Sequence, residues 1–127
     1  VDLWRSDDTG ESFEKICTPV APSRSGNPPT LTLLPDGRLV LVVGWRLPPY
    51  GIRAMVSATE GKTWTDWILL RTDAGTGDIG YPRTVLLPSG QLATSYYYAD
   101  EAEGPQAERY IGCTVWTPPR NVGGGKM

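Results

Sequence analysis

The chain has 127 residues, of which 39% are hydrophobic and 20% charged, with 15 glycines and 12 prolines. Its formal net charge of −2 offers no basic surface for a nucleic acid, and no apolar run reaches the roughly 18 residues of a membrane span. Histidine is absent, which excludes His-based triads and His metal sites. This composition predicts a turn-rich all-β protein, for which we expect neither metal nor cofactor.

Short strands separated by turn residues are predicted along the whole chain. The first 18 residues supply two strands around a turn at 6–13. The following predicted strands cover 31–34, 39–45, 52–56, 67–70, 82–87, 92–98 and 109–116. The strand at 39–45 is apolar on both faces, so we expect it to be buried between neighbouring sheets. The glycine-rich segment 120–127 is expected to be a flexible tail.

Two turn motifs recur in step along the sequence. SDDTGESF at 6–13 returns 51 residues later as SATEGKTW, and LLPDGRL at 33–39 returns 53 residues later as LLPSGQL. A repeat of this length with four antiparallel strands is typical of a β-propeller blade. The register predicts a partial propeller of about two blades: half a blade at 1–18, a complete blade at 19–72 and three strands of another at 73–119.

A partial propeller leaves the apolar faces of its terminal sheets uncovered. Propellers close with four to eight blades, so something must cover those faces. Two solutions remain open. Three copies of the chain could assemble into a six-bladed ring, or further N-terminal blades could complete it. Cys17 and Cys113 form no C-x-x-C pattern, and two unpaired thiols are favoured over a disulfide, which leaves the cellular compartment undecided.

The repeated turn resembles the Asp box of the sialidase-like BNR-repeat superfamily. The pattern Ser-x-Asp-x-Gly-x-Ser/Thr-aromatic is matched fully by Ser6, Asp8, Gly10, Ser12 and Phe13. The second copy has Thr59 in place of Asp, so we expect that turn to be less well satisfied. The aromatic residue is expected to anchor the turn, and Trp4, Trp64 and Trp67 are expected to lie in the core.

The resemblance also implies a candidate site for exo-sialidase-type hydrolysis of an acidic glycan. Tyr81 stands where sialidases have their nucleophile, and Arg53 stands four residues before an Asp box, where they have a carboxylate-binding arginine. Arg46 is a second cation in reach. The remaining catalytic groups of the family have no counterpart in this chain, so the chain lacks a complete catalytic set.

Strand topology supplies a separate reason for grouping these residues. In a four-stranded meander the turns alternate between two rims, and one rim collects Arg24, Asn27, Arg46, Tyr50, Arg53, Asp78, Tyr81, Arg83, Asp100 and Arg109. A guanidinium group binds a carboxylate with two parallel hydrogen bonds, which favours an acidic sugar. From this set we take Arg24, Arg46, Arg53, Asp78 and Arg83 as substrate-binding candidates.

Structural roles remain open for several of these residues. Arg53 could pair with a local acid, Tyr81 could pack on Pro82, and Asp78 could form a turn beside its glycines. The three tyrosines at 96–98 are expected mainly to pack within a buried strand. The alternative function is a non-catalytic propeller that binds carbohydrate or protein, or that self-assembles.

Overall fold

The computed structural model describes residues 1–23, 25, 26, 28–104 and 106–120, so Arg24, Asn27 and residues 121–127 of the tail predicted at 120–127 lie outside it. Among the described residues the strands are β1 (Leu3–Arg5), β2 (Glu14–Cys17), β3 (Thr30–Leu33), β4 (Leu39–Trp45), β5 (Gly51–Ser57), β6 (Ile68–Arg71), β7 (Gly80–Leu86), β8 (Leu92–Tyr98) and β9 (Tyr110–Trp116). One short 3-10 helix, η1 (Glu101–Glu103), follows β8. The predicted all-β class is therefore confirmed. No helix in the described part of the chain is long and apolar enough to cross a membrane.

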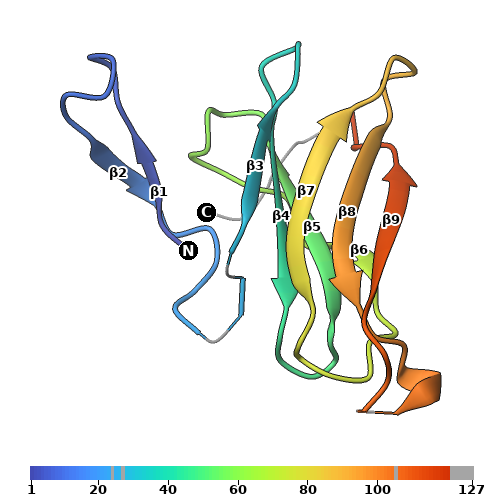
Figure 1. The fold of residues 1–127 in the computed structure, drawn as a ribbon. Coiled ribbons are helices and arrows are strands. Elements are labelled where there is room, and N and C mark those ends of the chain that lie inside the picture. The colour runs from blue at the N-terminus through green and yellow to red at the C-terminus, as the bar shows by residue number, and fades with distance from the viewer. Residues whose placement is uncertain (24, 27, 105, 121–127) are drawn as a thin grey trace.

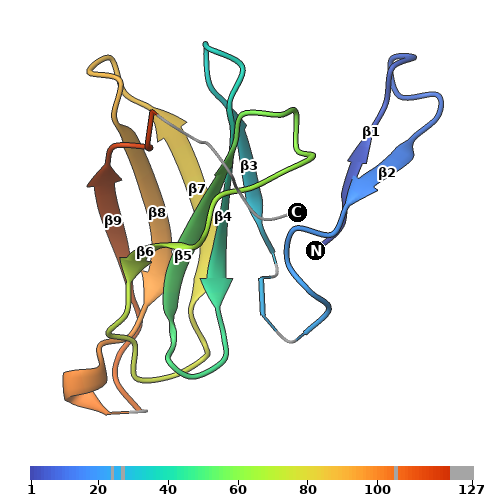
Figure 2. The same ribbon diagram turned by 180° about the vertical axis from the view of Figure 1, so that it is seen from behind.

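The strands form three separate antiparallel sheets, and each is a simple meander. The orders are β1-β2, β3-β4-β5-β6 and β7-β8-β9, and none of these sheets closes into a barrel. Figure 1 shows the sheets side by side, with the four-stranded sheet between the other two, and the view from behind in Figure 2 shows the same arrangement. The middle sheet is therefore covered on both of its faces.

Two layers of apolar side chains hold this arrangement together. Successive side chains of a strand point to opposite faces, and β4 carries apolar side chains on both faces. Val40 and Val42 pack toward the third sheet with Leu92 and Tyr96. Leu41 and Val43, with residues of the first hairpin, form the layer on the opposite face. These four residues of β4 are at most 4% exposed, which confirms the prediction of a strand buried on both sides.

The connections alternate between two ends of the sheets. Figure 1 shows the turns that join β1 to β2, β3 to β4 and β7 to β8 at the upper end. The connections at 46–50, 72–79 and 99–109 lie at the lower end, which we call the lower rim. The lower rim is where most of the predicted site residues lie.

The first repeated turn is organised by a serine and an aspartate. The Ser6 hydroxyl accepts the N–H of Gly10 at 2.8 Å, and Asp8 Oδ1 accepts the N–H of Ser12 at 2.9 Å. Asp8 also accepts hydrogen bonds from the Ser12 and Ser6 hydroxyls, and the bonds to Asp8, the one from the Ser12 side chain first, lower its pKa to about 2. The carboxylate therefore remains charged well below neutral pH.

The second repeated turn keeps the same bonds with a different side chain. Ser57 Oγ accepts the N–H of Gly61 at 2.9 Å, and Thr59 Oγ1 accepts the N–H of Thr63 at 2.8 Å. Thr59 was expected to leave this turn less well satisfied, yet its hydroxyl oxygen accepts the same N–H that Asp8 accepts in the first turn. Trp64 anchors this turn: it is 2% exposed, and its Nε1 donates to the Gly61 carbonyl at 2.9 Å.

The first hairpin departs from the expected packing. Phe13 is 61% exposed and Trp4 is 54% exposed, whereas both were predicted to pack against the core. Trp67 is half-buried against the apolar layer that includes Trp64. The difference follows from the size of the sheets, because two strands bury fewer side chains than four.

Candidate functional site

Tyr81 occupies an unusual backbone position at the beginning of β7. Gly44 of β4 and Gly80 of β7 approach so closely that a Cβ atom on Gly44 would lie 2.8 Å from the Gly80 Cα. The next residue, Tyr81, has φ = +49°, and the pairing with β8 shifts register between Gly80 and Arg83. A left-handed conformation costs a non-glycine residue about 1–2 kcal/mol. The irregularity turns the Tyr81 side chain outward, where it is 58% exposed.

An arginine and a second tyrosine lie against Tyr81. Its ring centre is 5.8 Å from that of Tyr97, and the Arg46 guanidinium carbon is 5.6 Å from the Tyr81 ring centre. Arg46 is held in place because its Nε donates to the Ile79 carbonyl at 3.0 Å and its backbone N–H donates to Ser25 Oγ at 2.7 Å. The residue directly after β4 thus places its cation beside the beginning of β7.

Asp78 connects the tyrosines to a second arginine. The Tyr97 hydroxyl donates to Asp78 Oδ1 at 2.7 Å, and Arg109 Nη2 lies 3.2 Å from Asp78 Oδ2. Arg46 Nη2 is 3.4 Å from the Tyr97 hydroxyl. We call these five residues, Arg46, Asp78, Tyr81, Tyr97 and Arg109, the Tyr81 cluster.

The charges of the Tyr81 cluster favour an anionic ligand. Two guanidinium groups face one carboxylate, so the cluster carries a net positive charge. Burial, and then the hydrogen bond to Asp78, raises the pKa of Tyr97, which is therefore a neutral O–H donor at pH 7. Arg109 Nη1 donates to the Ala107 carbonyl at 2.7 Å, but its buried Nε has no partner among the described residues. The Arg109 guanidinium group thus keeps one N–H without an acceptor among the described residues, although this N–H is buried.

Arg53 does not belong to this cluster. Arg53 pairs with Val43 and lies on the face of the middle sheet that is turned toward the first hairpin. Its guanidinium carbon sits 4.2 Å from the Trp45 ring centre, and the described residues place no carboxylate within ion-pair distance of it. Burial lowers the pKa of Arg53. Neither the predicted carboxylate clamp beside Tyr81 nor the alternative pairing with a local acid is seen in the described residues.

The other candidates are divided. Arg46, Asp78 and Tyr81 are brought together, whereas Arg83 is exposed on β7 and donates to the carbonyl of Pro82. Tyr97 was missed as a site residue because it lies in a run of three tyrosines predicted to pack. Tyr96 and Tyr98 do pack, at 2% and 0% exposure, but the intervening Tyr97 points to the opposite face.

Arg109 was predicted on the same rim and was not selected as a site residue. The alternation of side chains along a strand was the signal that singles out Tyr97. No comparable signal in the sequence marks Arg109, because its partner Asp78 comes from a different loop.

Another arginine, Arg71, lies beside the lower rim in a very different setting. Arg71 Nε and Nη2 bind the two oxygens of Asp73 at 2.8 and 3.0 Å, and Nη2 also lies 3.2 Å from Asp100. Its guanidinium carbon is 4.1 Å from the Tyr98 ring centre. Tyr110 donates to Asp100 and also lies 3.3 Å from Arg71 Nη2. We call these residues, Arg71, Asp73, Tyr98, Asp100 and Tyr110, the Arg71 cluster.

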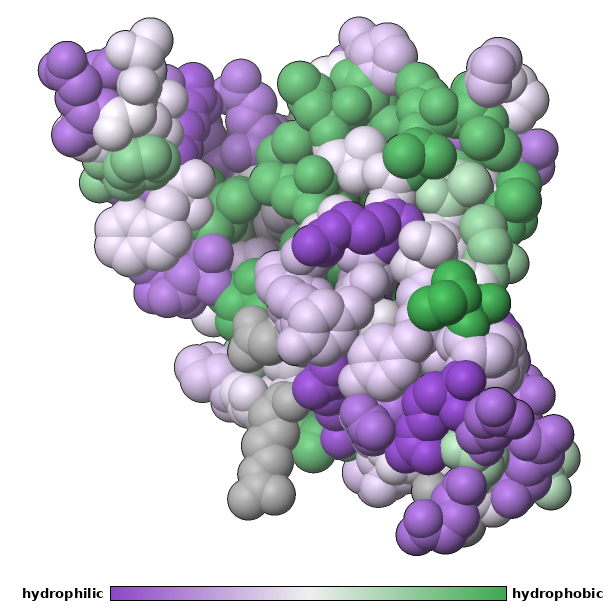
Figure 3. All heavy atoms as spheres, viewed as in Figure 1, coloured by the Kyte–Doolittle hydropathy of each residue, from purple (hydrophilic) through white to green (hydrophobic). Residues whose placement is uncertain are grey.

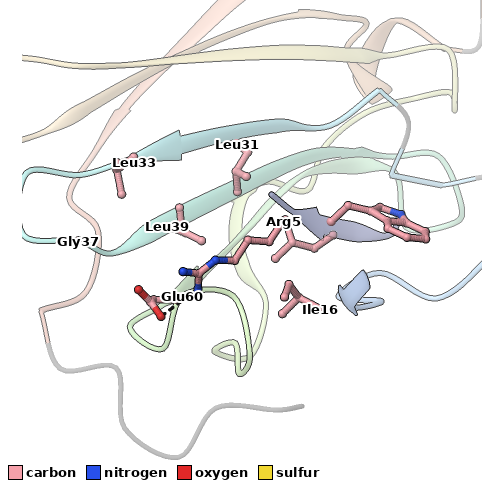
Figure 4. A pocket seen from close by; sticks show the side chains of 9 residues that line it. Arg5, Ile16, Leu31, Leu33, Gly37, Leu39 and Glu60 are labelled. Atoms are coloured by element: carbon pink, nitrogen blue, oxygen red, sulfur yellow. Dashed lines mark hydrogen bonds and ion pairs between the residues drawn. The ribbon is translucent and has the colours of Figure 1, made fainter. Parts of the chain in front are cut away.

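An apolar groove of about 340 Å³ separates the first hairpin from the middle sheet. Figure 4 shows Ile16, Leu31, Leu33 and Leu39 along it, with Arg5 and Glu60 at one end. The two charged groups pair with each other at 3.2 Å. The lining offers no nucleophile or proton-transfer group beyond this pair, so the groove is a packing surface and not a chemical site.

Exposed apolar side chains also gather near the upper ends of the other strands. Figure 3 shows hydrophobic residues over the upper parts of β3 and β7 to β9. Among the exposed large hydrophobic side chains of these strands, Leu33, Val85, Leu86 and Val115 lie near the upper ends, whereas the exposed Ile111 lies at the lower end of β9 and pairs with Tyr97. This patch is separate from the polar lower rim.

Comparison with known proteins gives one structural relative of undetermined activity. No family model matches the chain, and no curated protein matches it. The chain is similar to a crystal structure of a protein of unknown function from Dyadobacter fermentans DSM 18053, with 34% identity and a TM-score of 0.72. The match covers 91% of this chain and 30% of the Dyadobacter chain. The chain therefore spans about 30% of the length of a relative that shares its fold and whose function is itself unknown.

Proposed function

We propose that the three sheets are consecutive blades of a sialidase-like β-propeller and that the lower rim recognises an acidic glycan. The repeat of about fifty residues, the four-stranded antiparallel meander and the face-to-face stacking of sheets support the propeller. The hydrogen bonds of the two repeated turns support the Asp-box resemblance.

The observation that carries the glycan proposal is the Tyr81 cluster. Its two guanidinium groups and the Tyr97 hydroxyl are the donors that a carboxylate accepts. The exposed ring of Tyr81 beside them offers an apolar face on which a sugar ring can stack. A sugar that carries a carboxylate would use both features at once.

Recognition has more support than hydrolysis. A tyrosine nucleophile needs a base for its proton, and sialidases are an exception to the use of two carboxylates by glycosidases. Among the described residues, Asp78 accepts a hydrogen bond from the Tyr97 hydroxyl, and no carboxylate is hydrogen-bonded to the Tyr81 hydroxyl. Hydrolysis is the second candidate, favoured by the strained backbone of Tyr81, and it would need groups from other blades.

The uncovered apolar surfaces support an assembly larger than these three sheets. The groove beside β1 and the exposed face of β7 and β9 would both be covered in a complete propeller. We propose that three copies form a six-bladed ring or that further blades complete the propeller. A solution mass of three chains, measured by light scattering, supports the ring. A mass of one chain contradicts the ring and leaves completion by further blades as the remaining proposal.

The recognition proposal is tested by titrating N-acetylneuraminic acid into the isotope-labelled chain and following amide and arginine side-chain NMR signals. We expect binding that the neutral N-acetylglucosamine does not match, and about tenfold or greater weakening in Arg46→Met. Arg53→Met is the matched control, because Arg53 lies on the other face. Equal binding of the neutral sugar, or equal weakening by the control, would contradict the proposal.

The hydrolytic candidate has its own test. A fluorogenic sialoside reports turnover directly, and the assembled protein is the form to assay. If Tyr81 is the nucleophile, Tyr81→Phe abolishes turnover because the phenol oxygen is the attacking atom. Turnover that survives in this variant removes Tyr81 from the mechanism, and absence of turnover in the unaltered protein leaves recognition as the function.

A further inference from the structure

We infer that Asp78 is an internal stand-in for the ligand's carboxylate, and that an anionic ligand binds the Tyr81 cluster by displacing it. The inference rests on the proposed function for the identity of the sugar. The competition itself concerns any carboxylate, and it gives Arg109 and Tyr97 a specific role as the groups that receive the anion.

The geometry of Asp78 is that of a bound carboxylate. One oxygen accepts the Tyr97 hydroxyl at 2.7 Å, and the other lies 3.2 Å from Arg109 Nη2. One guanidinium group and one neutral phenol, each on a different carboxylate oxygen, form a common receptor for a free carboxylate. A ligand can therefore take over both bonds without any change in the receptor groups.

The contacts of Asp78 are easy to exchange. Its side chain is 64% exposed, and exposed ion pairs contribute little because water screens them. The backbone around Asp78 is fixed separately. A Cβ atom on Gly77 would lie 3.0 Å from the Arg46 carbonyl oxygen, and the Asp78 N–H donates to Thr76 Oγ1 at 3.3 Å. Rotation of the Asp78 side chain alone is enough to open the receptor.

The charges left after this rotation attract an anion. Arg46 Nη2, the Tyr97 hydroxyl and Arg109 Nη2 then face the ligand without a local carboxylate. Asp78 is the only carboxylate that an ion pair or hydrogen bond joins to these groups among the described residues. Arg109 is also incompletely satisfied before the ligand arrives, since its buried Nε has no partner in the described part of the chain.

The test uses acetate as a bare carboxylate and measures its dissociation constant by NMR titration of the unaltered chain and of variants. Asp78→Asn and Asp78→Ala both remove the competing charge, and each should bind acetate about 2- to 10-fold more tightly. Asp7→Asn is the matched control: Asp7 is an exposed aspartate that pairs with Arg5 on the first hairpin, and its loss should leave acetate binding unchanged. Arg109→Met should lose the binding.

Acetate and sugar separate the two proposals. Unchanged or weaker acetate binding in both Asp78 variants overturns the displacement inference, whatever the sugar does. Tighter acetate binding in these variants supports it. If N-acetylneuraminic acid then binds no better than acetate, the glycan proposal fails while the competition between Asp78 and a carboxylate stands. Acetate binding that survives in Arg109→Met also contradicts the inference.

Discussion

Two clusters of arginine, tyrosine and aspartate lie on the same rim and differ in their balance of charge. The Arg71 cluster has one guanidinium group for two carboxylates, and Asp73 binds it through both oxygens. The Tyr81 cluster has two guanidinium groups for one carboxylate, which is held by single contacts. The same three residue types therefore build one cluster in which carboxylates outnumber the guanidinium group and one in which guanidinium groups outnumber the carboxylate.

The number of hydrogen bonds that each arginine makes indicates its role. Arg71 joins β6 of the middle sheet to residues of β8, β9 and their connection, so its bonds hold two sheets together. Asp73 raises the pKa of Arg71, and Arg71 in turn lowers the pKa of Asp73. The Tyr81 cluster makes fewer such bonds and retains free donors. We assign stability to the first cluster and ligand binding to the second.

The largest expected effect comes from removing the two arginines in turn. Arg71→Met leaves Asp73 and Asp100 without their cation and removes the contact over Tyr98, so the free energy of unfolding should fall by about 2–3 kcal/mol. Arg109→Met should cost less than about 1 kcal/mol, because its ion pair is exposed. Urea denaturation measures both. Equal losses would remove the distinction between the clusters.

The next effect compares two tyrosine hydroxyls on neighbouring residues. The buried hydroxyl of Tyr98 donates to Asp73 Oδ1 at 3.0 Å and accepts the Asp73 N–H at 3.2 Å, so Tyr98→Phe should cost about 1–2 kcal/mol of stability. Tyr97→Phe should change stability by less than about 0.5 kcal/mol and weaken acetate binding. Thermal unfolding and NMR titration provide the two readouts. Acetate binding that is unaffected in Tyr97→Phe would exclude this hydroxyl from the receptor.

Much of the fold follows from local patterns in the sequence. The strands predicted at 39–45 and 92–98 have those bounds in the structure, because alternating or continuous apolar residues between turn signals determine them. The strand predicted to begin at residue 82 begins at Gly80. That shift comes from the register irregularity beside Gly44, a contact between two strands that no local pattern encodes.

The candidate site was predictable only as far as topology determines it. Arg46, Asp78 and Tyr81 were expected on one rim from the alternation of turns, and the structure brings them into one cluster. The same alternation and the resemblance both placed Arg53 with them, but the strand register puts it on the other face of the middle sheet. Since β4 and β5 are apolar on both faces, their pattern does not reveal which face Arg53 occupies.

A smaller effect is the pH dependence of stability that the Arg71 cluster contributes. Arg71 holds the pKa of Asp73 below its ordinary value near 4, so the stability from this pair is complete above that value and is lost as pH falls through the lowered pKa. Because Asp73 is 58% exposed, screening limits the loss to about 1 kcal/mol or less. Denaturation between pH 5 and pH 2 should show a shallower acid decline in Asp73→Asn. An unchanged slope would mean that other carboxylates carry the acid sensitivity.

The smallest effect concerns the backbone conformation of Tyr81 in the Tyr81 cluster. Tyr81 has φ = +49°, a conformation in which glycine is unstrained and alanine is not. Both Tyr81→Gly and Tyr81→Ala remove the ring, so their difference isolates the backbone. At an ordinary strand position alanine is the more stable of the two, whereas here we expect glycine to be more stable by about 0.5–1 kcal/mol. Thermal unfolding of the two variants gives the sign. Greater stability of the alanine variant would show that Tyr81 bears no backbone strain, and the strained backbone would then no longer favour hydrolysis as the second candidate.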